Sequence, residues 1–447
     1  FILLHNVSIN IHMLNTLINK TINIFYNKKL STFLKNYSQD IFIIYFVIIF
    51  FFWNVDYIIF EAKYLTAIIF LISFFAYTNN LTLLKNKKIL MIFFFLLIHF
   101  FLVVIQSKGN PIKENFLNYS FTIISILTVI LLYDQLKKNF LSIVKYFIFL
   151  FNSFFIIFIS FYLFENGSLN IDCYKGIFSE TGFIFRENSH FGLISSALLL
   201  YNSNIILENQ NNKNKTFFLI NTLIFFIISF LSISTSFLFT ILSLSTVFLL
   251  INNSIKKKIF YLGMIIISIL FLNFKEQCNY RSIENIKQAA KSIDIKFSED
   301  KEKEFDYSIE VPDQALSYKV FLKSIQVGVF TLPKNLIGVG INNYDQLFEK
   351  YGKRSDIFNG EENFLNIEDA SNNFSKIIGE FGFFGLILYF FLLIRLVKID
   401  PVNSFQIFLI TAILSQSLRG VGYFSAAFII LITTLYINIY EKKFKKK

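Results

Sequence analysis

The chain alternates between long apolar runs and short polar segments over most of its 447 residues. Runs such as 41–60 (IFIIYFVIIFFFWNVDYIIF) and 142–164 are apolar on every side, so they show no amphipathic periodicity. At about 1.5 Å per residue, roughly 20 helical residues cross a hydrocarbon core of about 30 Å. The pattern therefore predicts membrane-spanning helices rather than the helices of a soluble core.

Reading the runs against the polar segments predicts an all-α, polytopic transmembrane bundle of about twelve spans. The second, seventh and eighth runs are short or abut a neighbour, so ten or eleven spans also fit. The predicted spans are 41–60, 64–78, 89–106, 116–133, 142–164, 189–207, 216–232, 236–251, 259–274, 373–394, 403–418 and 421–440.

The net charge of +12 suggests nucleic-acid binding at first, but its placement along the chain argues against that class. Lys and Arg cluster in alternate short loops, which orients a protein in a membrane with those loops in the cytoplasm. Both termini are therefore predicted to be cytoplasmic. The basic loops contain Lys20, Lys28, Lys29 and Lys35; Lys85, Lys87 and Lys88; Lys137 and Lys138; Lys213 and Lys215; Lys256 to Lys258; Arg395 and Lys398; and the terminal EKKFKKK.

Segment 275–371 is the one long polar stretch, and a loop of this length can be translocated whatever its charge. Within it, 314–332 has apolar residues near helical spacing, which predicts an amphipathic helix on the membrane surface. The expected organisation is a cytoplasmic segment (1–40), a first membrane region of about nine spans (41–274), an extracytoplasmic loop (275–371), three further spans (372–440) and a basic cytoplasmic tail (441–447).

Four separated segments place unusual polar residues at the outer membrane boundary: RENSHFG (186–192), ISTS (233–236), the start of the tenth span (371–385) and QSLRGVGYF (416–424). Ionisable groups at membrane depth are costly, so they are usually functional or paired. The residues are Arg186, Glu187, His190, Ser234, Ser236, Asn372, Asn373, Glu380, Arg419 and Tyr423.

Two arginines at separate outer turns suit a diphosphate, because each guanidinium presents a planar fork of donors to phosphate oxygens. Glu187 or His190 could serve as the general base for an attacking hydroxyl. Structural roles compete with these: Arg186 could pair with Glu187, and Glu380 could be a packed, hydrogen-bonded residue of the tenth span. Gly379, Gly382 and Gly385 recur every three residues, which favours a close helix contact over a binding site.

Several chemistries lack their residues. The sequence has no Cys/His cluster, no HExxH and no tight Asp pair, so we expect neither a metal site nor a cofactor. KNLIGVG (334–340) lacks the Gly-Lys-Ser/Thr of a phosphate-binding loop. Cys173 and Cys278 both fall in predicted outer loops, where disulfides persist and where free thiols are also possible.

Four motifs together resemble the superfamily of O-antigen polymerases (Wzy-type) and O-antigen ligases. They are GFIFRENSHFG, SYKVFLKSIQ followed by PKNLIGVGINNY, SNNFSKIIGEFGFFGL and LRGVGYF, which span most of residues 165–425. Ligases usually carry a His before the Asn of the third motif, where this chain has Ser371. The ligases' Arg at the start of the long-loop helix is replaced by Tyr318–Lys319, so the resemblance favours a polymerase.

The resemblance implies a metal-independent glycosyltransferase of the bacterial inner membrane, which joins undecaprenyl-diphosphate-linked O-antigen repeat units on the periplasmic face. It implies undecaprenyl-diphosphate-linked oligosaccharide, membrane lipids and a chain-length regulator protein as partners, and no nucleic acid. Two alternatives stay open, an O-antigen ligase that transfers the glycan to lipid A core and a flippase or transporter. The implied catalytic residues are Arg186, Glu187 and His190, and the implied substrate-binding residues are Arg419, Tyr423, Asn372, Asn373, Ser236 and Lys319.

Overall fold

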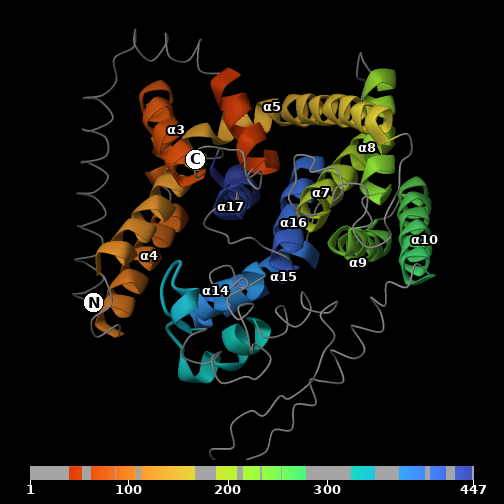
Figure 1. Cartoon of the computed structure of the whole chain (residues 1–447). Helices are drawn as coiled ribbons and strands as arrows, with labels where there is room; N and C mark the ends of the chain where they lie inside the picture. The colour runs from red at the N-terminus through yellow and green to blue at the C-terminus, as the bar shows by residue number, and fades with distance from the viewer. Residues whose placement is uncertain are drawn as a thin grey trace, which may run out of the picture.

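The computed structural model is a bundle of packed helices (Figure 1). The part of the chain that it describes is helical with connecting turns and contains no strand, which confirms the all-α prediction for that part. The described residues are 40–52, 62–85, 87–106, 112–166, 188–208, 215–231, 234–252, 254–277, 324–347, 372–397, 403–418 and 428–444.

The helices follow the predicted apolar runs closely, and Pro333 lies in the first turn of the short helix η5, where it removes no helical hydrogen bond. A short helix at Asp40–Phe50 opens the described part, with a π-helical end at Ile48–Phe52 (η1). The others are α3 (Ala62–Ala76), η2 (Thr78–Lys85), α4 (Lys87–Gln106), α5 (Ile112–Asn166), α7 (Asn188–Leu207), α8 (Lys215–Leu231), α9 (Thr235–Ile251), α10 (Ile255–Gln277), η4 (Gln326–Phe330), η5 (Leu332–Lys334), α14 (Asn373–Phe381), α15 (Phe383–Val397), α16 (Ser404–Leu418) and α17 (Phe428–Phe444).

The centre of the bundle is the antiparallel pair α7 and α16, with α9 packed against both. Two side-chain hydrogen bonds set the register of the pair: Ser196 Oγ lies 2.9 Å from Ser415 Oγ, and Asn204 Nδ2 donates to Ser404 Oγ at 2.8 Å. Nearly every described side chain of these two helices is buried. By contrast, α4, α8 and α10 each expose a row of large apolar side chains, as helices that face lipid do.

The predicted loop at 134–141 is wrong, because α5 is one continuous helix of 55 residues. The segment YDQLKKN is polar but contains neither Gly nor Pro, so its backbone can stay helical. Contacts on either side indicate that α5 changes direction there. At one end of the bundle, Tyr133 contacts Asn438 and Phe140 contacts Phe405. From this end, the two halves of α5 extend in different directions (Figure 1).

The predicted continuous span at 373–394 is also wrong. Gly382 has φ of 60° and separates α14 from α15. The three glycines therefore do not share one helix face. Each is nevertheless closely approached: a Cβ at Gly379, Gly382 or Gly385 would lie within 2.8 Å of a neighbouring atom. The described part of the predicted surface helix at 314–332 packs on α14, where Gly328 contacts the backbone of Ser375.

Two helices contain stretches long and apolar enough to cross a membrane, Ile89–Gln106 in α4 and Asn115–Glu165 in α5. Eight further apolar helical stretches of the described part are shorter, at 10–17 residues each. At about 1.5 Å per residue, the longest of these extend roughly 25 Å, close to the thickness of a hydrocarbon core.

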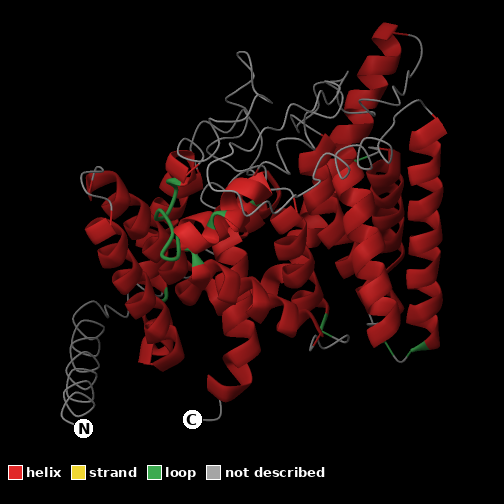
Figure 2. Ribbon diagram, turned by 90° about the horizontal axis from the view of Figure 1, so that it is seen from below, coloured by secondary structure: helices red, strands yellow, loops and turns green. Residues whose placement is uncertain are grey.

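Two groups of polar contacts between helices lie at opposite ends of the bundle. At one end, Lys257 Nζ lies 3.0 Å from Glu208 Oε1, which joins the start of α10 to the end of α7. Asn204 also donates to Glu208 at 3.0 Å, and the group of Glu208, Lys257, Asn204 and Ser404 is called the Glu208 cluster below. The nearby α9–α10 turn lies at the lower edge of the molecule in Figure 2. The other end holds the residues described next.

Candidate functional site

The structure describes only part of the predicted site. Arg186, Glu187, Arg419, Tyr423 and Lys319 lie outside the described residues, as do Cys173 and Cys278. His190 and Ser236 fall in the first turns of α7 and α9. The ion pair predicted between Arg186 and Glu187 therefore stays a prediction.

Asn372 and Asn373 begin α14 and are both fully buried. Asn372 is the N-cap: its backbone is extended, and its Oδ1 accepts a hydrogen bond from the Ser375 backbone N–H at 2.7 Å. Within the described part, neither amide atom of Asn373 makes a hydrogen bond. A buried amide without a partner is costly, so this helix start is a place where a polar group of a ligand would be stabilised.

Glu380, two turns further along α14, is completely buried. Its Oε2 accepts a hydrogen bond from the Asn342 backbone N–H at 2.7 Å, and the carboxylate also accepts from the backbone of Tyr344. Lys376 lies one turn before it with its Nζ 4.0 Å from Glu380 Oε1. The same Nζ is 3.4 Å from Asn342 Oδ1, so an acid and a base on one helix hold the same turn.

The turn at 335–343 and the end of α14 interlock through their backbones, and together they are called the clasp. Val339 N–H and Gly340 N–H donate to the carbonyls of Gly379 and Glu380 at 3.2 and 3.0 Å. Phe383 N–H donates to the Leu336 carbonyl at 2.9 Å. These bonds satisfy carbonyl groups that the end of α14 would otherwise leave without partners.

Glycine is required at two positions of the clasp. Gly338 has φ of 90°, and a Cβ there would lie 2.1 Å from the Glu380 carbonyl oxygen. Gly382 has φ of 60°, and its Cβ would lie 2.1 Å from the Leu336 carbonyl oxygen. The backbones approach too closely for any side chain, and left-handed φ values favour glycine.

A second group of residues, on α4 and α5, holds the opposite side of the same turn. His99 Nε2 lies 2.9 Å from the Ile337 carbonyl oxygen, which can only accept, so Nε2 carries the proton. The Nδ1 atom of His99 then accepts from the Tyr119 hydroxyl. Asn118 Nδ2 donates to the Ile341 carbonyl at 3.1 Å, and Asn343 Nδ2 donates to Asn115 Oδ1. The clasp therefore connects α4 and α5 to α14.

The start of α14 also lies beside the end of α16. The rings of Phe374 and Tyr389 meet edge to face at 4.7 Å, and the Tyr389 hydroxyl donates to Ser417 Oγ at 3.2 Å. Ser417 is two residues before Arg419 in the sequence. Two of the four predicted segments, 371–385 and 416–424, are thus neighbours where the structure describes them.

Sequence reasoning missed four members of this region: His99, Asn115, Asn118 and Tyr119. A signal for them existed. His99 interrupts an otherwise apolar run, and the polar residues at the start of α5 recur at helical spacing. The partners of His99, Asn115 and Asn118, however, are more than 220 residues away in the sequence, and no local pattern predicts such pairs.

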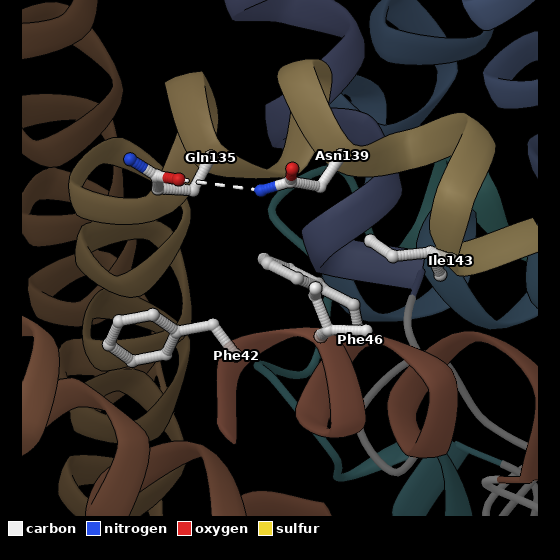
Figure 3. Close-up of a pocket in the computed structure, with 6 residues that line it drawn as sticks. Phe42, Phe46, Gln135, Asn139 and Ile143 are labelled. Atoms are coloured by element: carbon white, nitrogen blue, oxygen red, sulfur yellow. Dashed lines mark hydrogen bonds between the residues drawn. The ribbon is translucent and has the colours of Figure 1, made fainter. Parts of the chain in front are cut away.

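A small hollow lies elsewhere, between the Asp40–Phe50 helix and the middle of α5 (Figure 3). It is lined by Phe42, Ile43, Phe46, Gln135, Asn139 and Ile143. Asn139 Nδ2 donates to Gln135 Oε1 at 3.4 Å across its rim, as Figure 3 shows. Two amides and no ionisable group offer no acid–base chemistry.

The described residues contain no group of three or more His, Cys, Asp or Glu side chains that could hold a metal ion. Comparison with known proteins adds no assignment: no family model, no curated protein and no solved structure matches this chain.

Proposed function

We propose that the chain is a membrane glycosyltransferase that polymerises glycan units linked to undecaprenyl diphosphate on the extracytoplasmic face. The diphosphate is the leaving group, so the reaction needs no nucleotide sugar. In the proposed mechanism, Arg186 and Arg419 stabilise the departing diphosphate. Glu187 or His190 takes the proton from the acceptor hydroxyl, and the start of α14 contacts the glycan.

One observation carries this proposal. The turn PKNLIGVGINNY and the segment SNNFSKIIGEFGFFGL were singled out separately from the sequence, and they meet in the clasp. Such contact supports treating them as parts of one site rather than as two coincidental resemblances. The contact supports a likeness to the polymerase superfamily in fold alone. The reaction is argued from the residues themselves.

The proposed topology has about twelve spans and cytoplasmic termini. Its support is that Glu208, Lys257 and Ser404, which border three basic segments in the sequence, lie together at the end away from the clasp. A reporter that is active only outside the cytoplasm should be active when fused at residue 300 and silent at 86 or 256. Activity at 256 would contradict the orientation.

Deletion of the encoding gene tests the reaction. In a gel of the surface glycan, a polymerase mutant should show single repeat units in place of the ladder. Complete loss of attached glycan would instead indicate the ligase reaction. Accumulation of lipid-linked units on the cytoplasmic side would indicate a flippase. An unchanged ladder would contradict all three.

Substitutions at Arg186 test the diphosphate role. Arg186→Lys should fail nearly as badly as Arg186→Ala, because an ammonium lacks the planar fork of donors. Loss of one such group should lower the rate roughly a hundredfold, about 3 kcal/mol. The readout is glycan length normalised to membrane protein level. Normal length with Arg186→Ala at normal abundance would remove the role.

Two substitutions by Gln test which residue is the general base. Glu187→Gln should abolish polymerisation if Glu187 is the base, whereas His190→Gln should do so if His190 is. If Arg186 and Glu187 form a purely structural ion pair, the result should differ. Substitution of either residue would then lower the amount of protein in the membrane, and turnover per molecule would be unchanged.

A further inference from the structure

We propose that Glu380 is a positioning residue: it fixes the turn at 335–343 to α14 and thereby holds the turn beside the helix whose first residues the proposed function assigns to the substrate. The catalytic consequence rests on the proposed function. The geometry does not, because it is carried by the contacts of Glu380 alone.

The first step is the hydrogen bond between Glu380 Oε2 and the Asn342 backbone N–H at 2.7 Å. Asn342 has φ of 59°, a conformation that costs a non-glycine residue energy, although Asn tolerates it better than most. A carboxylate acceptor makes a stronger bond than a neutral one, and here it lies in a site without water contact. The bond therefore holds the turn in a conformation that it would not favour alone.

The second step is the charge of Lys376. Its side chain is 1% exposed, and it contacts Glu380 and the side chain of Asn342 together. A lone buried carboxylate would be expensive, and the charge of the lysine offsets part of that cost. The two residues are four apart on α14, so the helix itself presents them to one turn.

The third step is the path of the chain. The hydrogen bond joins residues 38 apart in the sequence. The helix α14 begins at Asn373 with Asn372 as its N-cap, two helical turns before Glu380. Glu380 therefore attaches the turn to the helix whose first residues the proposed function assigns to the substrate.

Hydrogen–deuterium exchange of the full-length protein in lipid nanodiscs tests the geometry. Glu380→Ala should speed exchange in the peptide containing 335–344 by about tenfold or more, since those amides lose their acceptor or its support. Glu380→Asp keeps the charge beside Lys376 but shortens the side chain, so it should fold and should show the same acceleration. Unchanged exchange in both variants would overturn the proposal.

A neutral double variant separates positioning from acid–base chemistry. Lys376→Met with Glu380→Gln keeps an acceptor for Asn342 and removes both charges. It should keep the slow exchange and the normal glycan ladder, whereas Glu380→Asp should shorten the ladder. Slow exchange with a lost ladder would mean that a charge of the Lys376–Glu380 pair takes part in the reaction, which would overturn a purely positioning role.

Glu208→Ala is the matched control, because it removes a carboxylate from a lysine at the other end of the bundle. It should leave exchange in 335–344 unchanged. Faster exchange there as well would show general loosening and would overturn the assignment to Glu380. If the exchange results hold but gene deletion leaves the glycan unchanged, the proposed function fails and the attachment of the turn to α14 by Glu380 stands.

Discussion

The two ends of the bundle each bury an acid beside a lysine, but they use the pair differently. In the Glu208 cluster, the two side chains touch at 3.0 Å, belong to different helices and are 12% and 9% exposed. In the clasp, Glu380 and Lys376 lie 4.0 Å apart on one helix and are 0% and 1% exposed. The first pair is a contact between helices. In the second pair, both residues lie on α14 and together bind the turn at 335–343.

The two pairs show how burial affects the stability that a pair of opposite charges contributes. Desolvation can cancel the attraction between two buried ions, so such a pair adds stability only when further hydrogen bonds satisfy it. The clasp supplies those bonds from the backbone of Asn342 and Tyr344. The Glu208 cluster supplies one from Asn204 and keeps some access to water. We therefore expect the clasp to be the less tolerant end.

The largest effect is expected from glycine substitution in the clasp. Gly338→Ala would place a Cβ 2.1 Å from the Glu380 carbonyl oxygen at a φ of 90°. Strain and overpacking together should cost about 3 kcal/mol or more of unfolding free energy. Thermal unfolding of purified protein in detergent, followed by size-exclusion chromatography, measures it.

Gly263→Ala is the control for that variant. Gly263 lies in α10, and a Cβ there would meet nothing within 4 Å. Because Ala is favoured over Gly in a helix by up to about 1 kcal/mol, this variant should be as stable as the wild type or slightly more so. A Gly338→Ala protein as stable as Gly263→Ala would contradict the tight approach of the clasp.

The second prediction compares the two acids directly. Glu380→Ala leaves Lys376 buried without its acid and should cost about 3–5 kcal/mol. Glu208→Ala leaves Lys257 near the end of a helix with some access to water and should cost about 1–3 kcal/mol. The measurement is again thermal unfolding. Equal losses, or a larger loss at Glu208, would reverse the comparison between the two ends.

The same comparison explains how much the sequence could predict. The helices could be predicted from the sequence because each apolar run is long enough that burial of its side chains determines its secondary structure. The predicted boundaries failed at two places where tertiary context decides. YDQLKKN continues a helix although it is polar, and Gly382 breaks one although its neighbours are apolar.

The clasp was only half predictable. Local patterns marked the turn and the start of α14, since Gly, Asn and a lone Glu in apolar surroundings are unusual. Nothing local indicated that His99 would bind the Ile337 carbonyl, 238 residues away. The candidate arginines and Glu187 lie outside the described residues, so their roles stay predictions.

The third prediction concerns the far side of the clasp. His99→Leu leaves the Ile337 carbonyl and the Tyr119 hydroxyl proton without their partner and should cost about 2 kcal/mol. Tyr119→Phe alone should cost about 1 kcal/mol. In the double variant, the second change should cost less than it does alone, because the hydroxyl proton has already lost its acceptor and only the bond to the Ile341 backbone remains to be lost. Strictly additive losses would show that the two residues do not act as one chain.

The smallest effects are expected where a hydrogen bond can be removed without leaving either partner alone. Tyr389→Phe at the clasp end takes a donor from Ser417, which still donates to the Ile413 carbonyl. Ser404→Ala at the other end takes an acceptor from Asn204, which still donates to Glu208. Each change should cost about 1 kcal/mol, the net value of one ordinary hydrogen bond. Because the chemistry lost is the same, the two ends should respond alike.

A loss for Tyr389→Phe as large as that for Glu380→Ala would mean that packing of α15 on α16, rather than the buried charge pair, makes the clasp end intolerant. Unfolding curves of both variants, measured beside Glu380→Ala and Glu208→Ala, separate these two explanations.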